Sequence, residues 1–152
     1  MAEPLLIEAR VAARDAMGEM YSGTLICVRM LGVLRCKQGR YPEADALLNQ
    51  AKTGLQRVFN EEHPSVLSCM SDQGILRYEQ GRYAEAEELL IASVKGIQAV
   101  CHDRHPTALR GIRQLIKLYE DCGKPDEAEK WRTRLPPEEA GQAIEDTGLD
   151  QK

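Results

Sequence analysis

Several kinds of segment that decide where a protein resides are missing from this sequence. No stretch approaches the ~18 consecutive apolar residues that a membrane-spanning helix needs, so we expect no membrane partner. The N-terminus has no basic region followed by an apolar run, so a secretory signal peptide is not predicted. Five cysteines without such a signal fit a reducing compartment, and we expect a cytoplasmic protein.

Motifs for the common kinds of catalysis are also missing. The sequence has no Gly-rich phosphate loop, no GxSxG turn, no HExxH helix and no CxxC pair. One cluster, CHDRH, brings together Cys101, His102 and His105, which are ligand types that zinc accepts. A second His-Pro pair, at His63, has no such neighbours, so we interpret both pairs as helix starts. We therefore predict no enzyme activity, no metal and no cofactor.

Residue types that favour strands are scarce. Aromatic residues make up 5% of the chain, and no run of β-branched residues is present, whereas Ala, Leu, Glu, Arg and Gln are abundant and favour helix. An excess of positive charge is lacking too. Five acids and one base in residues 136–152 account for the whole net charge of −4, which leaves residues 1–135 neutral. This balance argues against nucleic acid as a partner. The tail over 136–152 is acidic and has few apolar residues, so we expect it to be disordered.

What the sequence does contain is an internal repeat with a period of 42 residues. QGRYPEADALL (38–48) aligns with QGRYAEAEELL (80–90), and CGKPDEAEKW (122–131) aligns with both. The two His-Pro pairs keep the same spacing. A fixed period of this size is typical of stacked repeats.

The period also extends backwards to the N-terminus. AEPLLIEA (2–9) aligns with the segment 44–51, so the chain starts in the middle of a repeat. We expect either a segment of a longer array or a half-repeat that acts as a cap. Cys27 and Cys69 lie one period apart, and we interpret them as equivalent buried thiols.

Each repeat divides into two helical patterns, because apolar and small residues recur at i, i+3, i+4 and i+7. Pro64 and Pro106 suit a first helical turn, and Gly39, Gly81 and Gly123 suit the position just past a helix end. We expect helices near 2–17, 22–38, 42–58, 64–80, 84–101, 106–121 and 125–134.

The expected fold is all-α, a solenoid of antiparallel helix hairpins. Gly32 and Gly74 on the first helices, with Ala44, Ala86 and Ala128 on the second, permit close approach within each pair. One hairpin cannot bury its own apolar stripe, so copies stack. The expected division of the array 1–135 is a half-repeat, 2–20, and three repeats, 21–62, 63–104 and 105–135.

The segments LGVLRCKQGRYPEADALLNQA and QGILRYEQGRYAEAEELLIAS resemble tetratricopeptide (TPR) repeats. The period of 42 residues, with HP before the first helix and QGRY between the two, resembles the kinesin-light-chain type. The resemblance implies a right-handed superhelix and a protein–protein interaction module. An Asn-Asn pair that is usual in that type is replaced by Arg29-Met30, Ser71-Asp72 and Arg113-Gln114. The segment 112–132 resembles the last repeat of arrays in large multidomain bacterial proteins, which implies a larger parent protein.

The resemblance further implies a peptide-binding concave groove lined by the first helix of each repeat. Basic residues on one helical face would bind an acidic group of the partner by charge-assisted hydrogen bonds. The predicted groove residues are Arg29, Met30, Val33, Ser71, Asp72, Ile75, Arg110, Arg113, Gln114 and Lys117.

Two other hypotheses stay open. The array could be a structural spacer or a self-association segment, since the half-repeat at 2–17 offers Leu5, Leu6 and Ile7 as an apolar surface. Alternatively, the protein could be an enzyme that uses CHDRH as a metal site or Cys101 as a nucleophile.

Overall fold

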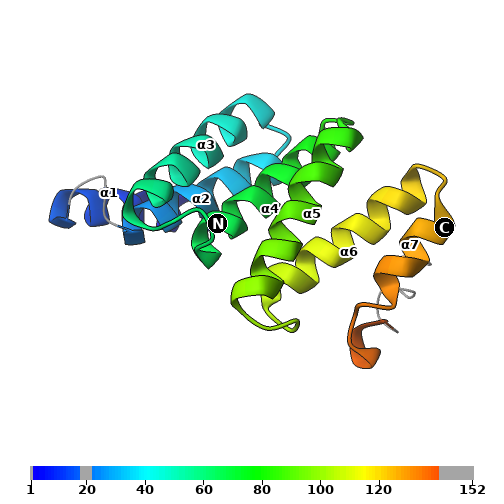
Figure 1. Cartoon of the computed structure of the whole chain (residues 1–152). Coiled ribbons are helices and arrows are strands. Elements are labelled where there is room, and N and C mark those ends of the chain that lie inside the picture. The colour runs from blue at the N-terminus through cyan, green and yellow to red at the C-terminus, as the bar shows by residue number, and fades with distance from the viewer. Residues whose placement is uncertain (1, 18–21, 141–152) are drawn as a thin grey trace.

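The computed structural model describes residues 2–17 and 22–140, and every regular element in these ranges is helical (Figure 1). Each expected helix boundary lies within two residues of the observed one. The helices are α1 (Ala2–Met17), α2 (Ser22–Lys37), α3 (Tyr41–Val58), α4 (Pro64–Glu79), α5 (Tyr83–Val100), α6 (Pro106–Asp121) and α7 (Pro125–Arg132). None of them is long and apolar enough to cross a membrane.

The three hairpin turns are built alike. Gly39, Gly81 and Gly123 have φ of 74°, 76° and 70°, a left-handed conformation that glycine adopts without a steric penalty. In each turn the residue after the glycine donates its N–H to a carbonyl five residues back, as Arg82 does to Arg77 at 2.8 Å. This bonding satisfies carbonyls that the helix end leaves free. The predicted role of the three glycines is confirmed.

The His-Pro pairs start helices, as expected. The Nδ1 atom of His63 accepts the N–H of Ser65 at 3.2 Å, and that of His105 accepts the N–H of Thr107 at the same distance. The following proline is the first residue of the helix, where its lack of an N–H removes no bond. Each histidine is therefore an N-terminal cap, and each proline begins the helix.

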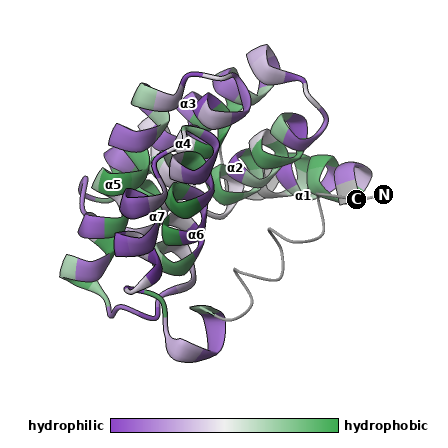
Figure 2. Ribbon diagram, turned by 90° about the vertical axis from the view of Figure 1, so that its right-hand side faces the viewer, coloured by the Kyte–Doolittle hydropathy of each residue, from purple (hydrophilic) through white to green (hydrophobic). Residues whose placement is uncertain are grey.

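Consecutive helices pack as antiparallel pairs, and the pairs stack side by side. Seen from the α7 end, α3 and α5 lie on one side and α2, α4 and α6 beside them on the other (Figure 2). Within pairs the helices approach closely at glycines. A Cβ built on Gly32 would lie 3.0 Å from Leu48, and one on Gly74 would lie 2.8 Å from Leu90. A larger residue there would push the two helices apart.

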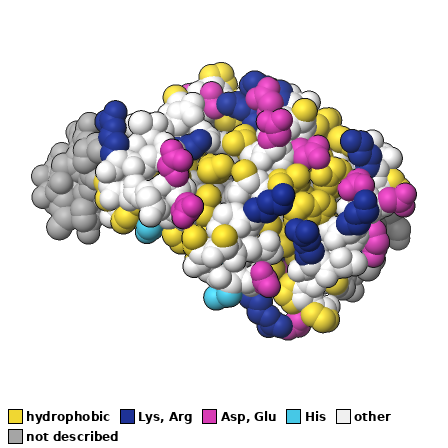
Figure 3. Space-filling view, in the orientation of Figure 1, with side chains coloured by type: hydrophobic (Ala, Val, Ile, Leu, Met, Phe, Trp, Pro, Cys, Tyr) yellow, Lys and Arg dark blue, Asp and Glu magenta, His cyan; other side chains and the backbone are white. Residues whose placement is uncertain are grey.

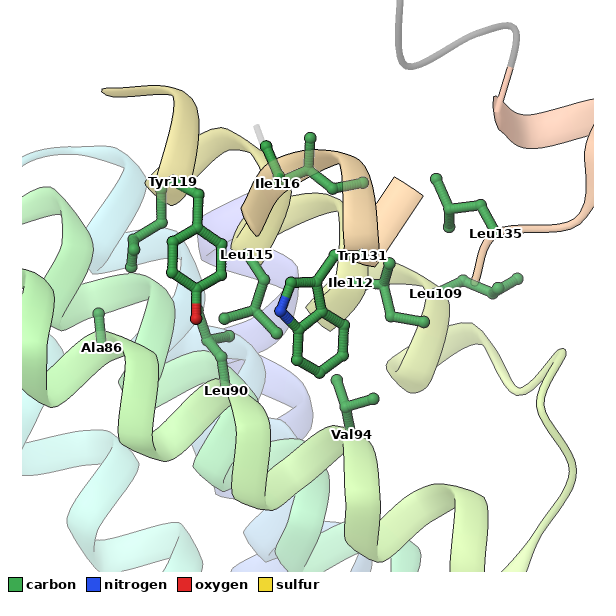
Figure 4. Close-up of a cluster of buried hydrophobic side chains, with 12 residues drawn as sticks. Ala86, Leu90, Val94, Leu109, Ile112, Leu115, Ile116, Tyr119, Trp131 and Leu135 are labelled. Carbon is green, nitrogen blue, oxygen red and sulfur yellow. The ribbon is translucent and has the colours of Figure 1, made fainter. Parts of the chain in front are cut away.

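The apolar core runs through the stack rather than through any one pair. Its largest cluster joins α5, α6 and α7, where Trp131 lies with Leu115 and Ile112 against Leu90 and Val94 (Figure 4). Further clusters link α2 and α3 to α4, and α4 and α5 to α6. Each hairpin thus buries its stripe against the next, which is the defining property of a repeat solenoid.

The C-terminal end of the array differs from the expectation. Helix α7 has 8 residues, whereas its equivalents α3 and α5 have 18, and Pro136 prevents a comparable length because the residue before a proline disfavours helical backbone. Leu135 then packs into the core, and a helical turn over 137–140 follows, with Ala140 against the same cluster. Residues 136–140 are therefore ordered rather than disordered, since they cover the last hairpin. The rest of the predicted tail, 141–152, lies outside the described residues.

Candidate functional site

The predicted groove residues belong to α2, α4 and α6, which contact one another in that order. We call this surface the first-helix face. At its centre, Arg29 of α2 donates to Asp72 of α4 at 2.5 Å, and Arg110 of α6 donates to the other oxygen of Asp72 at 2.7 Å. A single carboxylate thus joins the first helices of three consecutive repeats.

The Asp72 carboxylate is only 2% exposed, while Arg29 and Arg110 are partly open to solvent. Burial raises the pKa of Asp72 above its ordinary value, and the charges of Arg110 and Arg29 act in the opposite direction. A buried carboxylate needs such partners to stay ionised, because desolvation disfavours the charged form. The two arginines are structural partners of Asp72 as well as surface cations.

The third repeat carries the most accessible cations of this face. Arg113 is 47% exposed and donates to Glu139, a residue of the helical turn that follows α7. Lys117 lies over the ring of Tyr78, with its Nζ 5.7 Å from the ring centroid. Burial raises the pKa of Tyr78, and its hydrogen bond to Asp121 raises it further. The basic row predicted on α6 is therefore present, and it already binds groups of the same chain.

The apolar part of the face lies on α2. Ile26 and Met30 are exposed, at 36% and 45%, whereas Val33 and Ile75 are half-buried and pack against the core. Gln114 is half-buried as well. The face therefore has an apolar end on α2 and a basic end on α6.

Ser71 does not lie on the surface as predicted, because it is fully buried. Helix α6 comes close to α4 at Gly111, where a Cβ would lie 3.9 Å from the Ser71 Oγ. Gly111 therefore lies over the serine at an ordinary contact distance, whereas its tightest approach is to Val94 of α5, 2.6 Å from a Cβ built there. The sequence equivalence of Ser71 with Arg29 and Arg113 gave no sign of this burial.

Two residues that contact the predicted set were not foreseen as part of the site, namely Glu139 and Tyr78. The acidic composition after Pro137 was a usable signal for Glu139, since it lies close in sequence to the basic third repeat. Tyr78 had no comparable signal, because its position one turn from Ile75 is equally typical of a core residue.

The histidine and cysteine candidates of CHDRH lie in the turn between α5 and α6. The rings of His102 and His105 are 6.3 Å apart, and His105 uses its Nδ1 as a cap. Within residues 2–17 and 22–140, no three His, Cys, Asp or Glu residues gather in a way that could hold a metal ion. Cys69 is buried as predicted, whereas its equivalent Cys27 is half-buried.

Burial also governs the chemistry of two of the thiols. It raises the pKa of Cys69 to about 12 and that of Cys36 to about 11. A thiol with such a pKa is almost fully protonated at neutral pH and is a poor nucleophile. These two cysteines therefore act as small apolar core residues.

Comparison with known proteins places the fold. A tetratricopeptide repeat model matches residues 24–99, half of the chain, and no curated protein sequence matches. A crystal structure of a putative kinesin light chain from Podosopora anserina with nearly identical TPR-like repeats has a TM-score of 0.70 at 22% identity, covering 99% of this chain and 79% of that one. The structure of its Q17M variant has a TM-score of 0.68 at 21% identity, covering 99% of this chain and 68% of that one.

The crystal structure of BtubC (BKLC) from P. vanneervenii has a TM-score of 0.67 at 18% identity, with 97% of this chain and 56% of that one covered. The present chain thus spans about half the length of that protein. These identities support a common fold and repeat type rather than a common partner. Because the repeat model matches half of the chain and the hairpins follow solved kinesin-light-chain-like arrays, this chain belongs to the tetratricopeptide repeat family.

Proposed function

We propose that the first-helix face is a concave groove that binds a peptide or a partner domain. Repeats of this family are generally protein–protein interaction modules. In this proposal the protein is a cytoplasmic scaffold, part of a larger multidomain protein, and performs no chemistry of its own. Its ligand is a protein and not a nucleic acid, because residues 1–135 carry no net charge.

The observation that supports this proposal most is the contact between Arg113 and Glu139. It places a carboxylate on the accessible end of the guanidinium, as an acidic side chain of a partner would be placed. Arg113 is half-exposed, so exchange of one carboxylate for another requires no unfolding of the array.

The arrangement of the face also suggests the form of the ligand. An acidic residue would bind over Arg113 and Lys117 on α6, and an apolar residue would contact Ile26 and Met30 on α2. These positions are separated by α4, so the ligand has to be an extended segment or a helix that crosses all three helices. The Asp72 ion pairs lie between the two ends, where the Arg29 and Arg110 guanidinium groups already bind a buried carboxylate.

A quantitative pull-down tests the proposal. Proteins captured by the wild-type array are compared with those captured by Arg113→Glu and by Arg57→Glu, which reverses an exposed charge on α3. We expect the partner to be lost with Arg113→Glu and kept with Arg57→Glu, while circular dichroism shows both variants folded. A partner that binds Arg113→Glu as it binds the wild type would refute the groove assignment.

A second candidate function, self-association, is favoured by the surface of α1. Leu5, Ile7 and Val11 are 68%, 40% and 43% exposed, although their helix packs against α2. A terminal hairpin half of this kind leaves apolar surface that a neighbouring copy could cover. Sedimentation velocity decides this point, because a protein that stays monomeric at high concentration excludes it. A dimer that Leu5→Glu dissociates would support it.

A further inference from the structure

The first two repeats each contain an arginine that joins two hairpins, buried in the first repeat and half-buried in the second. Arg35 near the end of α2 contacts Glu43 of its own hairpin, with 3.2 Å from Nε to Oε2, and Glu3 of the preceding helix α1. Its side chain is 11% exposed. A guanidinium group thus lies between two carboxylates from different helices, where both can accept its N–H groups.

The second repeat has the same arrangement one period later. Arg77 contacts Asp45 of the preceding hairpin at 2.8 Å and Glu85 of its own hairpin at 3.6 Å. A glutamine completes each set, since Gln38 accepts from Arg35 at 3.0 Å and Gln80 accepts from Arg77 at 2.9 Å. The recurrence shows that this corner of the repeat is shaped to hold a guanidinium group.

The third repeat keeps the two carboxylates and replaces the arginine. Glu87 and Glu127 are the period equivalents of Asp45 and Glu85, but Tyr119 stands in the place of Arg77 and Cys122 in that of Gln80. The Tyr119 hydroxyl donates to Glu87 at 2.6 Å, and Glu127 accepts from Lys130 at 2.8 Å. A tyrosine supplies one donor and no positive charge, whereas an arginine supplies five donors and a full charge.

The replacement coincides with a cavity of about 510 Å³ between α5 and α7. It is lined by Glu87, Tyr119, Gly123, Lys124, Pro125, Asp126 and Glu127. Three of these residues are acidic and one is basic. Burial and the bond to Glu87 raise the pKa of Tyr119 to about 12, so the phenol stays protonated and its hydroxyl remains a donor.

A second cavity of about 580 Å³ adjoins the first, since Glu87 lines both. Ala84, Ile91 and Ala92 of α5 give it an apolar wall. The space-filling view shows hydrophobic side chains exposed between the positions of α5 and α7, with charged side chains around them (Figure 3). None of the lining residues belongs to the predicted groove on the first-helix face.

We propose that the cavity at Tyr119 binds the guanidinium group of an arginine side chain presented by a partner protein. Glu87 and Glu127 would hold it as Asp45 and Glu85 hold Arg77. Arginine fits better than lysine because its planar fork can bond two carboxylates at once. The adjoining apolar cavity would take the residue next to this arginine, which favours a peptide chain over a free cation.

A peptide titration followed by amide NMR of the full chain tests this site. The probe is the acetylated, amidated peptide Ala-Leu-Arg-Leu-Ala, and its control carries citrulline, which keeps the shape but not the charge. At millimolar concentration we expect saturable shifts at the amides of Glu87, Gly123 and Lys124 with the arginine peptide only. An absence of such shifts, or equal shifts with the citrulline peptide, would overturn the proposal.

Charge variants identify the groups responsible. Glu87→Gln and Glu127→Gln are expected to weaken the arginine peptide about tenfold or more, since each removes a charged acceptor. Glu61→Gln, which changes an exposed acid in the α3–α4 turn, should leave the affinity unchanged. Unchanged affinity in Glu87→Gln and Glu127→Gln would exclude these carboxylates as the binding groups.

The most direct variant restores, at position 119, the arginine that the first two repeats have at the equivalent position. Tyr119→Arg should place its own guanidinium between Glu87 and Glu127 and abolish binding of the peptide, whereas Tyr119→Phe should still bind it. A folded Tyr119→Arg protein that binds the peptide as the wild type does would refute the proposal. Tyr119 is buried, so if Tyr119→Arg does not fold, the half-exposed Glu127→Gln variant decides the outcome.

Discussion

The Arg29 guanidinium of α2 donates to the Asp72 carboxylate of α4 at 2.5 Å, across 43 residues of sequence. Together with the contact from Arg110 on α6, it makes one buried acid of α4 the link between three helices. The stacking of consecutive repeats therefore depends on a polar contact on the first-helix face as well as on the apolar core.

We predict that Asp72→Asn destabilises the array. The neutral amide cannot compensate both arginines, and the loss of two charge-assisted bonds is expected to cost about 1–3 kcal/mol. Chemical denaturation gives the free energy of unfolding. As a control, Asp103→Asn changes an exposed acid of the α5–α6 turn and should have almost no effect. Equal stability of the two variants would mean that the ion pairs contribute nothing net.

A second prediction concerns the hairpin turns. Gly81→Ala forces a side chain into the left-handed region, at φ of 76°, and should cost about 1–2 kcal/mol. Gly81→Asn should cost less, because asparagine tolerates this backbone conformation better. Thermal unfolding of both variants measures the order. If the alanine variant is as stable as the asparagine variant, the turn does not require the left-handed backbone.

Burial of thiols predicts both reactivity and pH dependence. In the folded protein Cys69 and Cys36 should resist iodoacetamide at neutral pH, while the exposed Cys122 reacts. The pKa of Cys69 rises from 9.0 to about 12 on folding, so its contribution to stability is fully present below pH 9 and is lost as the pH rises toward 12. Mass spectrometry of labelled peptides and unfolding curves at several pH values check these points.

To isolate that pH effect, unfolding of Cys69→Ala is followed over the same pH range. This variant should lose less stability above pH 9 than the wild type does. Identical pH profiles would show that other groups dominate.

The contact between Arg113 and Glu139 predicts competition with the proposed partner. Glu139→Gln should strengthen binding of an acidic partner about 1.4- to fivefold, because an exposed ion pair is worth about 0.2–1 kcal/mol. Calorimetry with the partner from the pull-down measures the change. Glu138→Gln, one residue away and contacting Arg104 at 3.5 Å, is the matched control. Equal affinities for both variants would exclude a role of Glu139 in covering Arg113.

The helices and their boundaries could be predicted from the sequence because their signals are local. A helix ends where a glycine adopts a left-handed backbone, and it begins where a histidine side chain caps free N–H groups. Gly81 and His63 show both effects. Repetition of these signals at a fixed spacing also predicted stacking, since a lone hairpin leaves its apolar stripe in water.

The partners of the charged side chains could not be predicted in the same way. Helical periodicity assigns a residue to a face, but a long side chain can reach any of several neighbours on adjacent helices. Ser71 illustrates the limit, since the packing of neighbouring helices buries a residue that periodicity places on the surface. Tyr119 illustrates the same limit. It occupies the repeat position of Arg35 and Arg77, but only the structure shows that Glu87 and Glu127 line the same cavity.

By itself, then, the sequence determined the repeat, the helix ends and the stacking of hairpins, because backbone conformation and apolar periodicity act over a few residues. The tertiary structure alone decided that Arg29 and Arg110 share Asp72, that Glu139 covers Arg113, and that a cavity opens at Tyr119. These contacts join residues 26 to 43 positions apart or lie between different hairpins. They depend on how far each hairpin is displaced and rotated against the next, which no local pattern encodes.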